Sequence, residues 1–117
     1  MNIIILGAGQ VGSSLAELLS KENNDVTVID LDRTNLQRLQ DRIDIRTVNG
    51  HASDPDILNQ AGLEEADMLI AATHVDDTNI VACQLAHILH KTPTKIARVR
   101  SSSYLNHPEL FDRSLNT

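Results

Sequence analysis

The sequence predicts an α/β domain in which helices cover both faces of a doubly wound parallel sheet. Two observations point to this class. Short apolar runs recur along the chain, and each is followed by a stretch in which apolar residues return at helical spacing. The chain also has one Tyr, one Phe and no Trp, so its core must consist of Leu, Ile, Val and Ala. An aliphatic core of this kind suits helices packed on a sheet.

The first half of the chain holds three of the five expected strands. Residues 2–6 are predicted to form a strand that is apolar throughout after Asn2, as expected where helices cover both faces of a sheet. Strands over residues 26–30 and 45–49 follow it. The helix after the first strand is expected to bury a face made of Val11, Leu15, Leu18 and Leu19. Asp32 is the expected N-cap of the next helix, whose apolar stripe comprises Leu36, Leu39 and Ile43.

A short helix and a fourth strand come next. Asp54 followed by Pro55 is a typical cap and first-turn pair, so a helix is expected to begin there. Gly62 is expected to end that helix in a left-handed conformation. The fourth strand is predicted over residues 67–73.

The longest helix is predicted to begin at Asp76 or Asp77 and to end at Thr92-Pro93. Its broad apolar surface is expected to comprise Ile80, Val81, Cys83, Leu85, Ile88 and Leu89. The fifth strand is predicted over residues 95–100. The tail at 101–117 is expected to add one or two helical turns and no further strand.

Length, charge and cysteine content limit the possible functions. With 117 residues the chain is expected to be a single domain spanning residues 1–117. Its formal net charge of −6 repels a phosphate backbone, so no nucleic-acid partner is expected. Cys83 is the only cysteine, which excludes an internal disulfide and indicates a reducing, cytoplasmic setting. The apolar run at residues 2–6 is far shorter than the roughly 20 residues of a membrane helix, so no direct membrane insertion is expected.

A glycine motif directly follows the first strand. The segment Gly7-Ala8-Gly9-Gln10-Val11-Gly12 matches G-x-G-x-x-G and opens an amphipathic helix, the setting in which this motif binds a dinucleotide. Gly7 permits the tight turn, Gly9 lets a pyrophosphate approach the backbone, and Gly12 lets helix and strand pack closely. Free amides and the helix dipole can hold phosphate even on an acidic domain. The motif predicts a Rossmann-type sheet of strand order 3-2-1-4-5; a tight turn without ligand is the alternative.

Asp30 ends the second strand, 18 positions after Gly12. This is close to the spacing expected for an acid that accepts hydrogen bonds from a ribose diol. A carboxylate there disfavours a 2′-phosphate, so Asp30 favours NAD or an adenosine diol over NADP; the adjoining Leu31 is also a candidate cofactor-binding residue. The alternative for Asp30 is a helix cap or a solvated strand end.

Further polar residues follow the third, fourth and fifth strands, at the sheet edge where α/β proteins bind ligands. His51 and Ala52 are placed to border an adenine, or they form a plain turn. Thr73 and His74 are placed near a phosphate or the second nucleoside, or they form a surface turn. Arg98 and Arg100 are predicted to share one face of the fifth strand, where one of them reaches phosphate or both are solvated or paired with Asp. The candidate cofactor-binding residues are therefore Gly7, Ala8, Gly9, Gln10, Val11, Gly12, Asp30, Leu31, His51, Ala52, Thr73, His74, Arg98 and Arg100.

The sequence gives no support for catalysis or for a metal site. Tyr104 is not followed by the Lys of a Tyr-x-x-x-Lys pair, and no G-x-S-x-G segment occurs. His87 and His90 are three positions apart on a predicted helix and are expected to be exposed helix residues. Cys83 is interpreted as a core residue. No catalytic and no metal-binding residues are therefore expected.

Four stretches together resemble the RCK or KTN domains, the nucleotide-binding lobes that regulate potassium transport. The stretches are residues 3–12, 48–53, 66–73 with Thr78-Asn79, and 97–101. The chain is most similar to the first such lobe in the peripheral subunit of Trk potassium uptake. The resemblance implies a non-catalytic cytoplasmic sensor at the inner face of the plasma membrane, with NAD(H) or ATP/ADP in its cleft. It also implies that lobes pair within a homo-oligomeric ring, and that the ring acts on a potassium-translocating membrane subunit of Trk type.

The chain departs from the usual pattern of this family in three respects. Members that bind ATP often carry Arg where this chain has Gln10, so the uncharged side chain favours NAD(H). His51 stands where an acid is often found, so that acid's adenine contact cannot be carried over. A complete family lobe also has a sixth strand, a crossover helix and a second lobe, so the chain is expected to be a fragment of a longer protein or a minimal lobe.

Two other functions fit parts of the pattern. The strands and glycines suit equally the N-terminal dinucleotide-binding half of an NAD-dependent dehydrogenase. A pure assembly module with a vestigial cleft is the third hypothesis. The missing catalytic side chains and the stretches after the third, fourth and fifth strands favour the potassium regulator.

Overall fold

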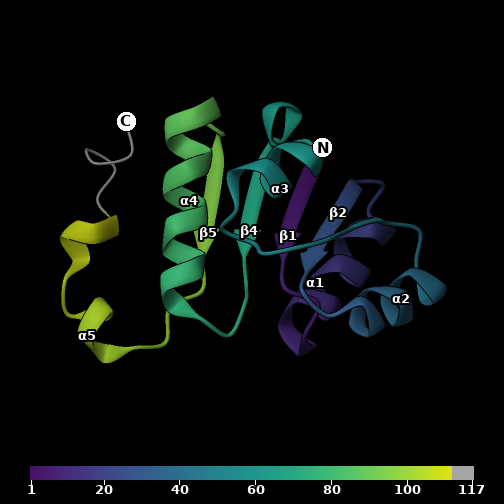
Figure 1. The fold of residues 1–117 in the computed structure, drawn as a ribbon, viewed down its shortest axis with the longest axis horizontal. Helices are drawn as coiled ribbons and strands as arrows, with labels where there is room; N and C mark the ends of the chain where they lie inside the picture. Colours follow the sequence, from purple (N-terminus) through teal and green to yellow (C-terminus); the bar gives the residue numbers. More distant parts are fainter. Residues whose placement is uncertain (112–117) are drawn as a thin grey trace.

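The computed structural model describes residues 1–111 (Figure 1). Strands and helices alternate along the chain, as the apolar runs predict. The strands are β1 (Asn2–Leu6), β2 (Asp25–Asp30), β3 (Arg46–Asn49), β4 (Met68–Ala71) and β5 (Thr94–Ala97). The helices are α1 (Gln10–Lys21), α2 (Arg33–Arg42), α3 (Pro55–Gln60), α4 (Asp76–His90) and α5 (Ser102–Leu105), with 3₁₀ turns η1 (Leu63–Glu65) and η2 (Pro108–Phe111).

The five strands form one parallel sheet in the order β3-β2-β1-β4-β5, which confirms the predicted topology. β1 lies at the centre and pairs with β2 on one side and β4 on the other. The chain therefore moves outward from β1 to β3, then crosses to the other side of β1 to form β4. The point between β1 and β4 where the direction reverses is the place where such sheets bind ligands.

Successive side chains of β1 enter two separate cores, because neighbouring residues of a strand point to opposite faces. Ile3 and Ile5 pack with residues of α1 and α2, among them Ala16, Leu36 and Leu39. Ile4 and Leu6 pack with residues of α3, η1 and α4, among them Leu58, Leu63, Ala82 and Ala86. Helices thus cover both faces of the sheet, as predicted, and α4 lies along β4 and β5 (Figure 1).

The predicted helix signals are confirmed. The Asp32 carboxylate accepts hydrogen bonds from the amides of Thr34 at 2.8 Å and Asn35 at 3.3 Å, and so caps α2. Asp54 caps α3 through the amide of Asp56 at 2.9 Å. Gly62 has a φ of 92°, in the left-handed region that favours glycine. The 3₁₀ turn η1 that follows it was not predicted.

The buried faces of α1 and α4 agree only in part with those predicted. Leu15 and Leu19 of α1 and Cys83 and Leu85 of α4 pack against the cores, but other residues are the most buried. In α1 the stripe facing the sheet contains Gly12 and Ala16, whereas Leu18 is 56% exposed. In α4 the buried residues are Asn79, Ala82 and Ala86, whereas Val81, Ile88 and Leu89 are exposed. Small residues face the sheet in both helices because they allow the helix axis to approach the strands closely.

The last predicted strand is too long. β5 ends at Ala97, since its partner strand β4 ends at the paired residue Ala71. Arg98 and Arg100 therefore lie in the loop after the sheet and not on one face of a strand. The predicted helical turns of the tail are present as α5 and η2, and the remainder, residues 112–117, lies outside the described residues. Within residues 1–111 none of the helices combines the length and apolar character that a membrane crossing needs.

Candidate functional site

A cleft of about 320 Å³ opens at the carboxyl ends of β1, β2 and β4. This volume lies in the range of small-molecule sites. The cleft is lined by the turn after β1, the end of β2, the loop after β3 and the loop between β4 and α4. Its lining residues are Gly7, Gly9, Ile29, Asp30, Leu31, Asp32, Asn35, Gly50, His51, Ala52, Ala72, Thr73, His74, Val75 and Thr78.

The fold brings most of the candidate residues together in this cleft. Gly7, Gly9, Asp30, Leu31, His51, Ala52, Thr73 and His74 all line it. Ala8 and Gln10 line a more open groove between α1 and α2 on the other side of the turn. Val11 and Gly12 lie in the first turn of α1. Arg98 and Arg100 are not among the lining residues.

The three glycines meet different steric demands. Gly7 has a φ of 103°, and a Cβ there would lie 2.9 Å from the Ala72 carbonyl oxygen. A Cβ on Gly12 would lie 1.8 Å from the Gly7 carbonyl oxygen, so only glycine allows α1 to pack against its own turn. A Cβ on Gly9 would meet nothing closer than His74 Nε2, at 3.5 Å. The structure itself therefore requires glycine at 7 and 12, whereas at Gly9 there is space beside the backbone.

The N-terminus of α1 carries no side-chain cap. Its N-cap residue is Gly9, and no acidic residue lies in its first turn. In contrast, aspartates cap α2 and α3. The first amides of any helix have no acceptor within the helix, so those of α1 remain open to an anion. The positive end of the helix dipole adds to this attraction.

The Asp30 carboxylate is hydrogen-bonded on both oxygens. Oδ2 accepts from the Ala8 amide at 2.6 Å and Oδ1 accepts from the Asp32 amide at 2.7 Å. Asp30 is half-buried and is not the cap of α2, a position that Asp32 occupies. An ionised carboxylate has about four acceptor sites, so Asp30 can still accept hydrogen bonds from a ligand.

Two histidines from different loops face the cleft. His51 Nδ1 contacts the amide and the hydroxyl of Ser53, at 3.2 Å and 3.0 Å, within the loop after β3. His74 lies beyond β4 and places its imidazole next to Gly9. The two rings therefore lie on separate walls, with the glycine turn beside His74.

Sequence analysis did not assign Asn35, Thr78 or Asn79 to the site. Asn35 and Thr78 each lie in the first turn of the helix that follows a strand, which brings them to the cleft edge. Asn79 is completely buried and bonds to Thr73 on the cleft wall. A polar side chain within the buried stripe of α4 is the signal that could have found it.

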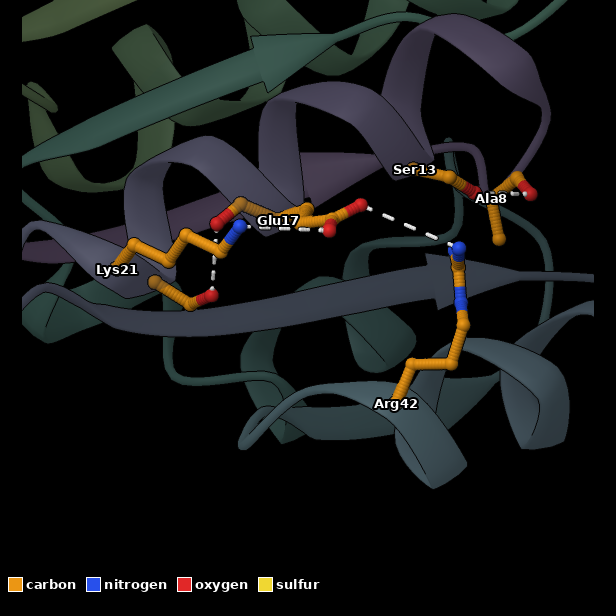
Figure 2. A network of polar contacts seen from close by, with 6 residues as sticks. Ala8, Ser13, Glu17, Lys21 and Arg42 are labelled. Atoms are coloured by element: carbon orange, nitrogen blue, oxygen red, sulfur yellow. Dashed lines mark hydrogen bonds and ion pairs between the residues drawn. The ribbon is translucent and has the colours of Figure 1, made fainter.

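Polar contacts join α1 to α2 and to the glycine turn. Figure 2 shows Glu17 between Lys21 of the same helix, at 3.6 Å, and Arg42 of α2, at 4.0 Å. The Ser13 hydroxyl donates to the Ala8 carbonyl oxygen at 2.8 Å. The ion pairs are exposed and contribute little to stability, roughly 0–1 kcal/mol each.

Cys83 has the environment of a core residue. It packs against the cluster on the α3 and α4 face of the sheet. Burial raises the pKa of its thiol to about 11, and the charge of Lys95 opposes the increase. Within residues 1–111 no three His, Cys, Asp or Glu side chains are grouped to hold a metal ion.

Residues 3–113 match the family model of the TrkA-N domain. The Trk system potassium uptake protein TrkA of Halomonas elongata is 60% identical over 111 residues, covering 95% of this chain and 24% of that protein. The protein of the same name from Vibrio alginolyticus is 54% identical over 114 residues, covering 97% of this chain and 25% of that protein. The chain thus spans about a quarter of the length of these relatives.

Solved structures with the same fold include nucleotide complexes. The Kef C-terminal domain of Shewanella denitrificans in its AMP-bound form has a TM-score of 0.69 at 28% identity, covering 82% of this chain and 57% of that one. The TrkA-N domain of the Escherichia coli inner membrane protein YbaL has a TM-score of 0.70 at 30% identity, with 81% and 67% covered. The GsuK channel bound to NAD has a TM-score of 0.68 at 22% identity, covering 80% and 17%, a likeness of fold alone.

Proposed function

The chain belongs to the TrkA-N domain family, and from this premise we propose that it is a regulatory nucleotide-binding domain of a potassium uptake system. One observation carries the proposal. A single cleft joins the glycine turn, the uncapped N-terminus of α1 and the carboxylate of Asp30. These groups suit the two charged or polar parts of a dinucleotide, its phosphates and its ribose.

The pyrophosphate of the ligand would lie against Gly7 and Gly9. At Gly9 the lack of a side chain leaves space for a phosphate oxygen to reach the backbone, and the first turn of α1 supplies amide donors. Asp30 would accept hydrogen bonds from the ribose hydroxyls of the adenosine with its remaining acceptor sites. In this arrangement one carboxylate holds both the turn, through Ala8, and the sugar.

The other lining residues complete the proposed contacts. Leu31, His51 and Ala52 would border the adenine, while Thr73 and His74 would border the phosphates or the distal nucleoside. Gln10, Val11 and Gly12 would contribute backbone amides of α1. Arg98 and Arg100 lie outside the cleft, so the proposed ligand contacts do not include them.

NAD(H) is the ligand that the cleft fits best, with ATP or ADP as the alternative. Asp30 and Asp32 place two carboxylates at the end of β2, where a 2′-phosphate of NADP would be repelled. Gln10 offers no charge to a terminal phosphate. The Kef domain, which is 28% identical, supports an adenine nucleotide in this cleft, since that domain is bound to AMP.

The regulatory part of the proposal comes from the relatives. These are named potassium uptake proteins, and this chain corresponds to about a quarter of them. We propose that residues 1–117 are one nucleotide-binding domain of a longer cytoplasmic protein. Copies of that protein would assemble into a ring at the inner face of the membrane. Ligand-dependent changes in the ring would gate a potassium-translocating subunit of Trk type.

The proposed function includes no catalytic step. The dehydrogenase hypothesis requires that the protein transfer hydride between the bound nicotinamide and a second substrate. Oxidation of NADH by the intact protein with any small carbonyl compound would favour that hypothesis and contradict the regulatory one.

Two measurements test ligand binding. Mass spectrometry of nucleotide released from the purified and denatured protein identifies what the cleft holds after purification. Titration calorimetry with NADH, NADPH and ATP then ranks the ligands, and NADH is expected to bind more tightly than NADPH. Equal affinities for NADH and NADPH would contradict the role of the β2 carboxylates. Failure of all three to bind would overturn the proposal.

A further inference from the structure

We propose that Asn79 is a positioning residue that links the cleft to the segment after β5. Ligand binding and the order of residues 98–104 would then depend on each other. The inference rests on the proposed function, because it requires a nucleotide in the cleft. It adds to that function a physical link through which a nucleotide in the cleft would affect residues 98–104, which follow the last strand.

Asn79 uses the full hydrogen-bonding capacity of its side-chain amide while completely buried. Its Oδ1 accepts from the Thr73 amide at 3.0 Å and from the Thr73 hydroxyl at 2.7 Å. Its Nδ2 donates to the carbonyl oxygens of Thr73, at 3.1 Å, and of Arg98, at 2.8 Å. One side chain therefore joins the end of β4 to the residue that follows β5.

The Thr73 side of this link belongs to the cleft. Thr73 lines the cleft wall, and its amide, carbonyl oxygen and hydroxyl all contact Asn79. A ligand that packs against Thr73 would restrict the motion of the amide, carbonyl oxygen and hydroxyl that bond to Asn79. Ligand contact at Thr73 would therefore hold Asn79 in place and, through it, the Arg98 carbonyl oxygen.

The other side of the link belongs to the segment after β5. The Arg98 amide still pairs with the Ala71 carbonyl oxygen at 2.8 Å. Asp76 then accepts from the amides of Arg100 at 3.1 Å and Ser101 at 2.7 Å. Asp77 accepts from the Tyr104 hydroxyl. The first turn of α4 thus holds residues 98–104, and within the described residues Asn79 is the side chain that bonds to both this segment and Thr73.

Asparagine is specifically suited to the link. Aspartate keeps the size and the acceptors but loses both donors, so it would face the carbonyl oxygens of Thr73 and Arg98 with a charge.

A coupling between two sites is reciprocal, so a ligand that orders residues 98–104 is itself bound more tightly when they are ordered.

Hydrogen exchange on the full chain tests the inference, with NADH as the probe. Saturating NADH is expected to slow exchange in the wild type both at residues 7–12 and at residues 98–104, the latter at least about fivefold. In Asn79→Asp, saturating NADH should still slow exchange at residues 7–12 but leave residues 98–104 unchanged. Asn59→Asp is the matched control. The Asn59 side chain bonds to His90 at the far end of α4, at 3.1 Å, so this variant should behave as the wild type.

The possible outcomes separate the two proposals. Protection at residues 7–12 without any at residues 98–104 in the wild type would overturn the inference and leave the proposed function intact. So would a full response of residues 98–104 in Asn79→Asp. The absence of protection and of calorimetric binding in the wild type would overturn the proposed function and the inference with it. If Asn79→Asp does not fold, Thr73→Val replaces it as the test, because this variant removes the hydroxyl bond to Asn79. At saturating NADH it should reduce the protection of residues 98–104. Undiminished protection would overturn the inference.

Discussion

The carboxylate of Asp30 accepts a 2.6 Å hydrogen bond from the amide of Ala8, 22 residues earlier in the chain. The end of β2 thereby holds the glycine turn that follows β1. Asp30 is consequently a structural residue of the cleft before any ligand arrives. A substitution there acts on the turn as well as on a bound ribose.

Asp30→Ala is expected to weaken NADH binding about tenfold to hundredfold, since the loss of a hydrogen bond to a charged group costs roughly 1.5–3 kcal/mol. Titration calorimetry measures this change. Asp54→Ala is the control, because Asp54 caps α3 and does not line the cleft. The control should lose about 1 kcal/mol of stability with its NADH affinity unchanged. Unchanged affinity in Asp30→Ala would show that the ribose contact is wrong.

Gly9→Ala and Gly12→Ala should separate binding from folding. A Cβ added at Gly9 would meet no protein atom closer than 3.5 Å, so Gly9→Ala should fold while its methyl group blocks the proposed phosphate position. We expect its affinity for NADH to fall at least about tenfold, a loss of about 1.4 kcal/mol. Gly12→Ala would place a Cβ 1.8 Å from backbone oxygen, so it should lose about 3 kcal/mol of stability or more. Thermal unfolding and calorimetry together distinguish these effects, and wild-type NADH binding by Gly9→Ala would contradict the phosphate position.

Tyr104 is the only tyrosine, so the absorbance of the phenolate reports its ionisation alone. The hydrogen bond to Asp77 is the main cause that raises the pKa of Tyr104 above its ordinary value of 10.0. A raised tyrosine pKa favours the neutral form in the fold. The corresponding stability is fully present below pH 10 and is lost as the pH rises through the folded-state value.

A spectroscopic titration should therefore give a midpoint above that of the unfolded chain. Asp77→Ala should return the midpoint toward the ordinary value. Asp41→Ala is the control. It also removes one carboxylate, but Asp41 bonds to Gln37, so the titration of Tyr104 should not change. Identical midpoints in the wild type and Asp77→Ala would contradict the contact.

Cys83 should react slowly with a disulfide reagent. Burial raises its pKa from 9.0 to about 11, so at pH 8 the folded chain holds about a hundredfold less thiolate than the unfolded one. The reaction in urea is expected to be faster by at least that factor, as measured by release of the coloured thiol. The stability that accompanies this shift is present below pH 9 and is lost as the pH approaches 11. Equal rates with and without urea would contradict the buried position.

The sequence predicted those parts of the fold that depend on local signals. The unbroken apolar run Ile3 to Leu6 indicated a central strand, and aspartates at 32 and 54 indicated two helix starts. The glycine turn and Asp30 were predicted to meet because the topology brings the ends of β1 and β2 together. Each of these features is set by neighbouring residues or by strand order.

Features that depend on packing could not be predicted in the same way. Leu18 fits an apolar stripe of α1 by spacing, yet Gly12 and Ala16 face the sheet because small residues allow close approach. A polar residue within the buried stripe of α4 marks Asn79, but the sequence could not name its partners, since Thr73 and Arg98 meet it only in three dimensions. The end of β5 was misplaced because it is set by the length of its neighbour β4.

The bare start of α1 also bears on the lifetime of the protein. Without a ligand, that helix end relies on water, and a bound phosphate would complete it and raise the free energy of unfolding by mass action. Proteases attack transiently opened chains, so degradation would slow when dinucleotide is plentiful. Under the proposed function, the concentration of nucleotide would then affect the amount of this protein in the cell as well as its regulatory activity.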